Sequence, residues 1–459
     1  MAGISSPHDA SPTIVRYGVL VFISLASVSA YLTRYCLSVA NTTIGRELQL
    51  SDTQMGQVMA AWGLGYFICQ VPGGWLGTRF GTRKTLAGLS VIWSVLTVWT
   101  SFAYSFRPLW WSRMTFGLAQ AGLVPNTAEI IKSWFPASRR GMASACIGAS
   151  MSVGGVVAMK ATGELRDTYG YDWLTIFQAY SLVGIVWSAA FYAYFRTRPN
   201  DHPWVNAAEV DLIRESPLAE TPDAVDVQPR YEDSRRARAG QMLASRSLWG
   251  ICIQSYFRAA GYLLFVTWLP AFLEYAYGLS VADAASYTTW PLIGVIVGNM
   301  GGGLVVDAVY KMTGSRRLSR TGVAVASLSM CALFTFASTR AGSPELFAGF
   351  LACGACFSGL ANPPAWAATM DIAGPQTAVV MGIMNMVGTI AGFTVPNRLG
   401  ALIDRIQHTD GDWNTVILIH VVFYACAALS WLLVDPNRAI GEPAGGKPES
   451  TAQQSYEAR

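Results

Sequence analysis

Long apolar runs, separated by short polar segments, follow one another along most of the 459-residue chain. Each run is close to the roughly 20 residues that a helix needs to cross a bilayer. The pattern predicts twelve transmembrane helices, near residues 17–40, 54–77, 84–104, 108–131, 142–163, 173–195, 248–273, 286–309, 321–338, 344–368, 377–403 and 414–434. We therefore expect an all-α polytopic membrane protein.

One long polar segment, residues 196–246, interrupts the series after the sixth predicted helix. It carries five prolines and charges of both signs, which is typical of a linker, and a short helix is expected around Ala207–Arg214. The linker divides the chain into a six-helix bundle at 17–195 and a second one at 247–435. Polar tails are expected at 1–16 and 436–459.

Basic residues are unevenly distributed over the predicted connections. Most of the 32 Lys and Arg fall in the termini, in the linker and in the connections that follow even-numbered helices. Because Lys and Arg are enriched on the cytoplasmic side, both termini and the linker are predicted to be cytoplasmic, in a multi-pass protein of the cell membrane. A formal net charge of only +4, without a dense basic run, argues against nucleic acid as a partner.

Five cations lie within the predicted helices: Arg34, Arg113, Lys160, Arg258 and Arg398. A charge inside a transmembrane helix is costly, so it marks a functional site unless it snorkels to the membrane surface. Arg34 lies deep in the first helix with no acidic residue near it in sequence, which predicts an anion site. Snorkelling stays open as an alternative for Arg113 and Arg258, and it is the favoured interpretation of Lys160 and Arg398.

A short motif rich in glycine and basic residues recurs in both predicted bundles. Gly73-Gly74-Trp75-Leu76-Gly77-Thr78-Arg79-Phe80-Gly81-Thr82-Arg83-Lys84 connects the second and third helices, and Gly303-x-x-x-Asp307 occupies the equivalent place in the second bundle. The first run resembles the G-x-x-x-D-R-x-G-R-R/K loop of the major facilitator superfamily. In that family the loop clamps neighbouring helices and helps to gate the cavity. The resemblance implies gating roles for Gly73, Gly77, Arg79, Gly81, Arg83, Lys84, Gly303 and Asp307, and Thr78, in place of Asp, implies a weaker clamp.

Further motifs resemble the anion:cation symporter branch, which includes bacterial sugar-acid permeases, sialin and the vesicular glutamate transporters. They are Tyr31-Leu32-Thr33-Arg34, Gln70-Val71-Pro72-Gly73-Gly74, Ser133-Trp134-Phe135-Pro136 and Met381-Gly382-Ile383-x-Asn385-x-x-Gly388-x-x-Ala391-Gly392. Arg34 matches the first-helix arginine of the branch. Arg258, Arg113 and Tyr66 match residues of the vesicular glutamate transporters. The resemblance implies a secondary transporter of a small organic anion that works by alternating access.

Residue chemistry supports an anion site without the family. Arginine presents a planar fork of N–H donors that binds a carboxylate or phosphate bidentately. We expect Arg34 and Arg258, one from each bundle, to hold the anion, with Arg113 as a further candidate. The hydrogen-bonding groups expected around a hydroxylated substrate belong to Tyr66, Gln120, Tyr262 and Asn385. The predicted substrate is a sugar acid, a hexuronate or a dicarboxylate.

Several alternatives stay open. The chain is interpretable as an exchanger of organic phosphate or other anions, or as a transporter-like sensor that binds an anion without moving it. An enzyme is not expected, because the sequence shows no nucleophile–base pair, metal cluster or nucleotide-binding loop, and no cofactor or metal is predicted. Thr33 and Gln120 stand where proton-coupled relatives carry acids. Symport with another cation, exchange for a counter-anion and uniport are therefore all open.

Overall fold

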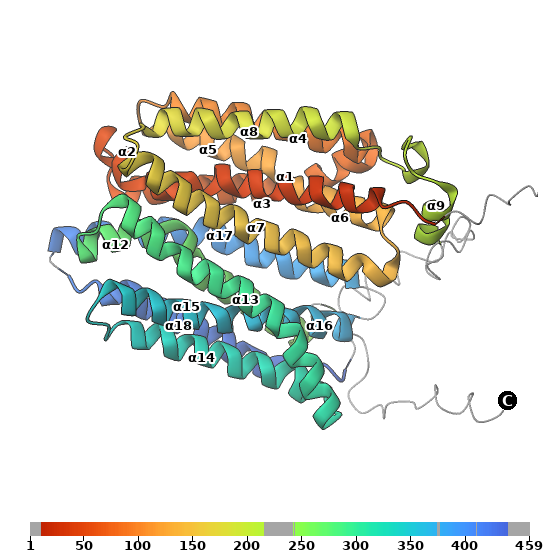
Figure 1. Ribbon diagram of the computed structural model, residues 1–459. Coiled ribbons are helices and arrows are strands. Elements are labelled where there is room, and N and C mark those ends of the chain that lie inside the picture. Colours follow the sequence, from red (N-terminus) through yellow and green to blue (C-terminus); the bar gives the residue numbers. More distant parts are fainter. Residues whose placement is uncertain (1–10, 215–241, 243, 374–376, 410, 439–459) are drawn as a thin grey trace, which may run out of the picture.

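The computed structural model describes residues 11–214, 242, 244–373, 377–409 and 411–438. This part of the chain forms a bundle of long helices and contains no β-strand (Figure 1). The predicted all-α fold class is thereby confirmed.

The six spans predicted before the linker correspond to helices in one layer of the bundle, the upper one in Figure 1. We call this layer the N-half. Its helices are α1 (Val15–Val39), the short α2 (Asn41–Glu47), α3 (Asp52–Phe80), α4 (Thr82–Ser101), α5 (Phe106–Gln120), α6 (Leu123–Trp134), α7 (Ala137–Asp167) and α8 (Trp173–Tyr194).

The six later spans form the C-half. It consists of α11 (Arg246–Leu263), the π-helical η2 (Leu264–Trp268), α12 (Leu269–Tyr277), α13 (Val281–Thr313), the π-helical η3 (Leu318–Gly322), α14 (Val323–Ser338), α15 (Pro344–Leu360), α16 (Asn362–Ala373), α17 (Thr377–Thr409), α18 (Asn414–Ser430) and η5 (Trp431–Leu433).

Eight helices or continuous helix runs in the described part are long and apolar enough to cross a membrane. The other four predicted spans correspond to α3, α4, the α5–α6 pair and α17. A helix that is covered by neighbouring helices needs less apolar surface than one that faces lipid on most sides. Two of the four, α3 and α17, pack against each other across the halves, which is consistent with their more polar composition.

The fourth span of each half is broken near its middle. In the N-half the helix ends at Gln120 and α6 begins at Leu123. In the C-half α15 ends at Leu360 and α16 begins at Asn362, in a segment that contains two prolines. Proline lacks the main-chain donor of a helix, and paired breaks of this kind are typical of transporters built from repeats.

The two halves contact each other mainly through α3 with α17 and α7 with α13. Glycines bring the main chains of α3 and α17 together: a Cβ atom on Gly63 would lie only 2.4 Å from the main-chain oxygen of Gly392. Gly56 is similarly close to the main-chain oxygen of Pro396. Gly56 lies in the second turn of α3, which begins at the end of the bundle opposite α9 (Ala207–Arg214), here called the far end, and Gly63 lies two turns further toward the middle (Figure 1).

Carboxylates of each half accept hydrogen bonds from the opposite half at the far end. With the donor first, the bonds are Thr42–Glu274 (2.7 Å), Tyr275–Asp52 (3.2 Å), Thr53–Asp404 (2.6 Å) and the main-chain N–H of Ala282 with Asp167 (2.6 Å). The last two bonds join equivalent spans, since each connects the second span of one half to the fifth span of the other. The first turn of α3 bonds to the last turns of α17, and the first turn of α13 bonds to the end of α7.

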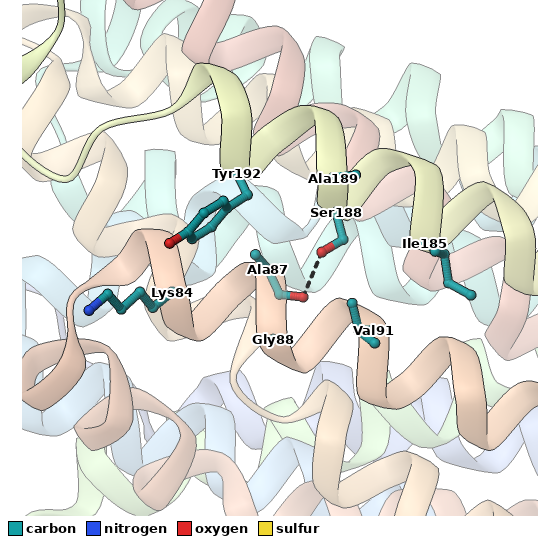
Figure 2. Close-up of a pocket in the computed structure, with 8 residues that line it drawn as sticks. All are labelled: Lys84, Ala87, Gly88, Val91, Ile185, Ser188, Ala189 and Tyr192. Atoms are coloured by element: carbon teal, nitrogen blue, oxygen red, sulfur yellow. Dashed lines mark hydrogen bonds between the residues drawn. The ribbon is translucent and has the colours of Figure 1, made fainter.

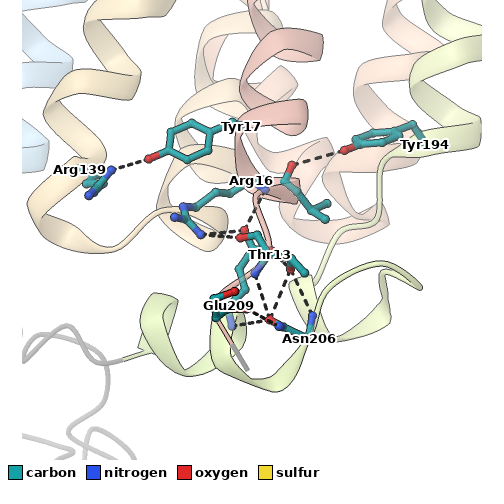
Figure 3. A network of polar contacts seen from close by, with 9 residues as sticks. Thr13, Arg16, Tyr17, Arg139, Tyr194, Asn206 and Glu209 are labelled. Atoms are coloured by element: carbon teal, nitrogen blue, oxygen red, sulfur yellow. Dashed lines mark hydrogen bonds and ion pairs between the residues drawn. The ribbon is translucent and has the colours of Figure 1, made fainter. Parts of the chain in front are cut away.

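The helical part of the linker is anchored to the N-half (Figure 3). Glu209 of α9 and Arg16 form an ion pair of 2.9 Å, with side chains that are 0% and 8% exposed. Glu209 also accepts the main-chain N–H of Arg16 and bonds to Thr13, and Asn206 bonds to the same segment. The helix predicted at Ala207–Arg214 is confirmed, and it is attached to the beginning of α1.

His202 fills the space between the linker and the N-half. Its ring lies 5.8 Å from that of Trp134 and 5.1 Å from that of Tyr194. Burial lowers the pKa of His202 from its ordinary value, and the nearby Arg196 acts in the same direction. The imidazole is therefore held in its neutral form at pH 7.

Candidate functional site

Arg34 lies near the end of α1, in the interior of the N-half, and only 8% of the residue is exposed. Its Nε donates to Oε1 of Gln120 over 3.1 Å. Its Cζ lies 4.1 Å from the ring centroid of Tyr31 and 4.1 Å from that of Trp62. A hydrogen bond and two aromatic faces thus fix the guanidinium group, which is favourable for bidentate binding of an anion.

Gln120 is the last residue of α5, directly before the break in the fourth span. Its Oε1 also accepts a hydrogen bond from Nε1 of Trp62 (3.3 Å), and its Nε2 donates to the main-chain oxygen of Ala30 (2.9 Å). The side-chain amide is neutral, so it orients Arg34 without compensating its charge.

Arg113 lies two turns before Gln120 on α5 and is only 2% exposed. One of its terminal nitrogens, Nη2, donates to the main-chain oxygen of Arg34 over 3.3 Å, and its Cζ lies 4.2 Å from the ring centroid of Phe116. Its Nε and Nη1 are buried without a hydrogen-bond partner. This burial excludes the snorkelling alternative for Arg113 and places its charge next to that of Arg34.

Two tyrosines connect Arg34 with the C-half. Tyr262 of α11 bonds to Tyr35 and interacts electrostatically with Arg34 on one side and with Tyr424 on the other. Tyr424 in turn interacts with Arg258, which is partly exposed and whose Nε is buried without a partner. Arg34 in the N-half and Arg258 in the C-half thus each have one of these two tyrosines as a neighbour.

The other candidate side chains differ in their positions. Tyr66 of α3 belongs to the cluster, since its ring centroid lies 5.6 Å from Cζ of Arg34. Asn385 has an exposed side chain on α17, and in the described part no hydrogen bond joins that side chain to the arginines. Lys160 and Arg398 are exposed, and Lys160 pairs with Glu164 over 3.0 Å, as expected for charges outside a binding site.

The glycine-rich run between α3 and α4 contacts the break in the fourth span. Gly73 packs against Gly122, and Gly77 packs against the side chain of Asn126. Gly81 has a φ of +83°, which L-residues with side chains rarely adopt. Arg83 donates from Nε to the main-chain oxygen of Tyr192 over 2.9 Å. Three further predicted gating residues are exposed: Arg79, Lys84 and Asp307. A Cβ atom added to Gly303 would meet no other atom within 4 Å.

Lys84 also lines a shallow groove of about 410 Å³ between α4 and α8 (Figure 2). The hydroxyl of Ser188 donates to the main-chain oxygen of Ala87 over 2.8 Å at its base. The remaining lining residues are mostly small or apolar. None of them belongs to the cluster around Arg34, so the groove is separate from the candidate site.

Sequence reasoning missed Tyr31 and Trp62 as members of the site. Tyr31 lies three residues before Arg34 on α1, and Trp62 lies four residues before Tyr66 on α3. Side chains at these spacings share one face of a helix. The sequence thus carried a signal for both residues, in the helical periodicity around residues already identified as candidates.

Comparison with known proteins identifies the family. The model of the Major Facilitator Superfamily matches residues 23–396. The chain is 28% identical over 431 residues to the probable sulfoacetate transporter SauU of Cupriavidus necator, covering 93% of this chain and 96% of the relative. It is 27% identical to the probable galactarate/D-glucarate transporter GudP of Escherichia coli strain K12 (95% and 97% covered) and to the hexuronate transporter of Bacillus subtilis strain 168 (94% and 97% covered).

A solved structure shows the same fold. The chain is similar to a bacterial homologue of the human lysosomal transporter Spinster, in an inward-facing and unoccupied conformation, with a TM-score of 0.72 and 17% sequence identity. The similarity covers 94% of this chain and 100% of the other. The helical architecture and the match over most of the sequence agree. The chain is a multi-pass membrane protein and belongs to the major facilitator superfamily.

Proposed function

We propose that this protein is a secondary transporter of a small organic anion, of the sugar-acid, hexuronate or dicarboxylate type, and that Arg34 binds the anion. The observation that carries the proposal is the environment of Arg34. Its guanidinium is fixed by Gln120, Tyr31 and Trp62, and its charge is not compensated by a carboxylate within the described part of the chain. The names of the relatives, which include sulfoacetate, glucarate and hexuronate transporters, support the same substrate class.

Arg258 is proposed as the contact from the C-half. An anion bound between Arg34 and Arg258 would lie beside Tyr262, which already contacts both halves. Tyr66 and Gln120 would shape the pocket, and Arg113 would add positive potential. Because each half would hold one side of the anion, binding would favour the state from which the halves rock between the two faces of the membrane.

The proposed orientation places α9 and both termini in the cytoplasm and the far end outside the cell membrane. It rests on the distribution of Lys and Arg. In this orientation the hydrogen bonds and the Gly56 contact of the far end close the outer side. The six-helix bundles at 17–195 and 247–435 would move relative to each other, with the glycine-rich motifs at Gly73 and Gly303 contributing to the inner gate.

Ligand-induced thermal stabilisation of the purified full-length protein tests the proposal. A ligand that binds the folded state raises the melting temperature by mass action. We expect at least one sugar acid or dicarboxylate to stabilise the wild type and not the Arg34→Ala variant. Lys160→Ala, which removes an exposed cation, is the control and should retain the shift. Equal stabilisation of the wild type and Arg34→Ala would contradict binding at Arg34.

Anion exchange is the transport mode that the site favours. Thr33 is buried and bonds to the main chain of its own helix, and Gln120 is neutral, so neither side chain beside Arg34 carries a titratable proton. Exchange predicts rapid uptake into vesicles loaded with an anion and slow uptake into empty ones. Equally rapid uptake into empty vesicles would instead support uniport or coupling to another cation.

A further inference from the structure

The central arginines lack acidic partners. Ion pairs in the described part of the chain join Arg16 with Glu209, Arg46 with Glu274, Lys160 with Glu164, Arg320 with Asp371 and His408 with Asp404. Arg34, Arg113 and Arg258 take part in none of them. Their neighbours are an amide, aromatic rings, hydroxyl groups and a main-chain oxygen.

Positive charge that is buried without a counter-charge is unfavourable in a transmembrane bundle. Arg113 shows this most clearly, because it is 2% exposed and two of its nitrogens, Nε and Nη1, have no hydrogen-bond partner. Arg113 donates to the main-chain oxygen of Arg34, so the two positive charges are adjacent. Negative charge from a ligand would offset this cost.

The three charges form two groups. Arg34 and Arg113 are adjacent in the N-half, where Arg113 donates to the main-chain oxygen of Arg34. Arg258 belongs to the C-half, where it interacts with Tyr424, and Tyr262 interacts with both Tyr424 and Arg34. A ligand with a single acidic group can compensate one of these groups and leaves the other uncompensated.

We propose that the site selects a dianion with two separate acidic groups, such as a dicarboxylate or a sulfonate-carboxylate, and that the neutral side chain of Gln120 sets this selection. The inference rests on the proposed function, because it takes Arg34 as the anion-binding residue. One acidic group of the ligand pairs with Arg34 in the field of Arg113, and the other pairs with Arg258.

Gln120 determines the charge of the site because of its position. Its Oε1 is already the acceptor for Nε of Arg34 at 3.1 Å. A carboxylate at the same place would pair with Arg34 and neutralise one of the two charges in the N-half. The guanidinium that pairs with the first acidic group of the ligand would then be occupied, and Arg258 would remain as the direct partner for one acidic group. Gln120 is thus a specificity-determining residue.

A matched pair of ligands tests the inference on the purified full-length protein. D-glucarate and D-gluconate share a six-carbon hydroxylated skeleton and differ in a second terminal carboxylate. Calorimetric titration of the wild type should show at least tenfold tighter binding of D-glucarate. In a second pair, the dianion sulfoacetate should likewise bind more tightly than the monoanion acetate. Equal affinity for the two members of each pair would overturn the inference, whatever the behaviour of the variants.

Substitutions at Gln120 then test its role. Gln120→Glu should weaken the binding of D-glucarate at least tenfold. The binding of D-gluconate should be unchanged or tighter, so that the preference for D-glucarate is lost. Gln120→Asn keeps the site neutral and should preserve the preference even if both affinities fall. Gln178→Glu is the matched control, because it adds the same charge to α8, where Gln178 bonds to Ser101. This variant should also keep the preference for D-glucarate. An unchanged preference in Gln120→Glu would overturn the role of Gln120.

The outcomes separate this inference from the proposed function. Absence of binding by every anion tested, or undiminished binding by Arg34→Ala, would refute the proposed function and the inference together. Binding that depends on Arg34 but does not distinguish D-glucarate from D-gluconate would refute only the selection of a dianion.

Discussion

Arg34 donates from Nε to Oε1 of Gln120, a residue at the end of a different helix and directly before a break in that helix. The bond connects the fixed guanidinium group on α1 to the most irregular part of the fourth span. A rearrangement of the break would therefore change the orientation of Arg34. This connection gives the proposed anion site a direct structural link to the broken fourth span.

Trp62→Leu should weaken anion binding about 5- to 30-fold, because a desolvated cation–aromatic contact contributes about 1–2 kcal/mol. The substitution removes the ring that lies 4.1 Å from Arg34 and the hydrogen bond to Gln120. Calorimetric titration measures the effect. Trp111→Leu, at an exposed position of α5, is the control and should bind like the wild type. Unchanged affinity in Trp62→Leu would mean that the ring does not position Arg34.

Gly63→Ala should hinder the close approach of α3 and α17. The new methyl group would lie 2.4 Å from the main-chain oxygen of Gly392, and overpacking of this kind costs about 1–3 kcal/mol. We expect transport to fall at least tenfold and hydrogen exchange at the start of α3 to accelerate. Gly301→Ala on α13 meets no atom within 4 Å and should transport normally. Normal transport by Gly63→Ala would show that this close approach is not needed for transport.

Thr53 and Asp404 should stabilise the closed far end jointly. A double-mutant cycle with Thr53→Ala and Asp404→Ala should give a coupling of about 1 kcal/mol, as expected for one hydrogen bond, or about a fivefold shift in opening. Hydrogen exchange in the first turn of α3 reports the opening. The bond of Tyr287 to Glu345 joins two helices of the C-half, so Tyr287→Phe should leave this exchange unchanged.

Glu209→Ala should release α9 from the N-half. The substitution leaves Arg16 without its buried partner, and breaking such a pair costs about 3–5 kcal/mol when the remaining charge stays buried. Arg16 lies in the first turn of α1, so release of α9 would rehydrate it and reduce the cost. We expect a lower melting temperature and faster proteolysis at Ala207–Arg214. The control Asp201→Asn, at an exposed position, should change neither, and an intact α9 in Glu209→Ala would contradict the anchoring role.

Acidification should weaken the attachment of the linker through His202. The pKa of His202 is lowered in the folded state, so its contribution to stability is complete above the unfolded value of about 6.5 and decreases as the pH falls below it. Proteolysis of α9 should therefore be faster at pH 5.5 than at pH 7.5. A His202→Phe variant lacks the titrating group and should show a smaller difference between the two pH values. An equal difference in both proteins would assign the pH dependence to another group.

The spans and the linker helix followed from hydrophobic pattern and composition, because a bilayer imposes helix length and polarity on each crossing segment. The importance of Arg34 followed from the cost of a charge in such a segment. The burial of Arg113 could not be predicted in the same way, since its position near a helix end permits either a surface or an interior orientation. In the structure Arg113 turns to the interior and donates to the main-chain oxygen of Arg34, which is 79 positions away in the sequence.

The carboxylates of the far end illustrate a second limit of the sequence. Glu274 and Asp404 lie near predicted helix ends, where an acidic residue ordinarily faces water. Their donors, Thr42 and Thr53, are more than 200 residues away and belong to the opposite half. Pairings of this kind depend on how the two halves dock, which periodicity within one helix does not encode.

The three central arginines also have an electrical consequence. They remain with the protein after the anion leaves, so the empty transporter carries three positive charges in its middle, whereas a bound dianion compensates two of them. Moving one charge across the membrane changes the energy by about 2.3 kcal/mol per 100 mV. An interior-negative potential should therefore hold the empty transporter facing inward and act much less on the loaded one. Net uptake should accordingly respond to voltage more strongly than exchange does.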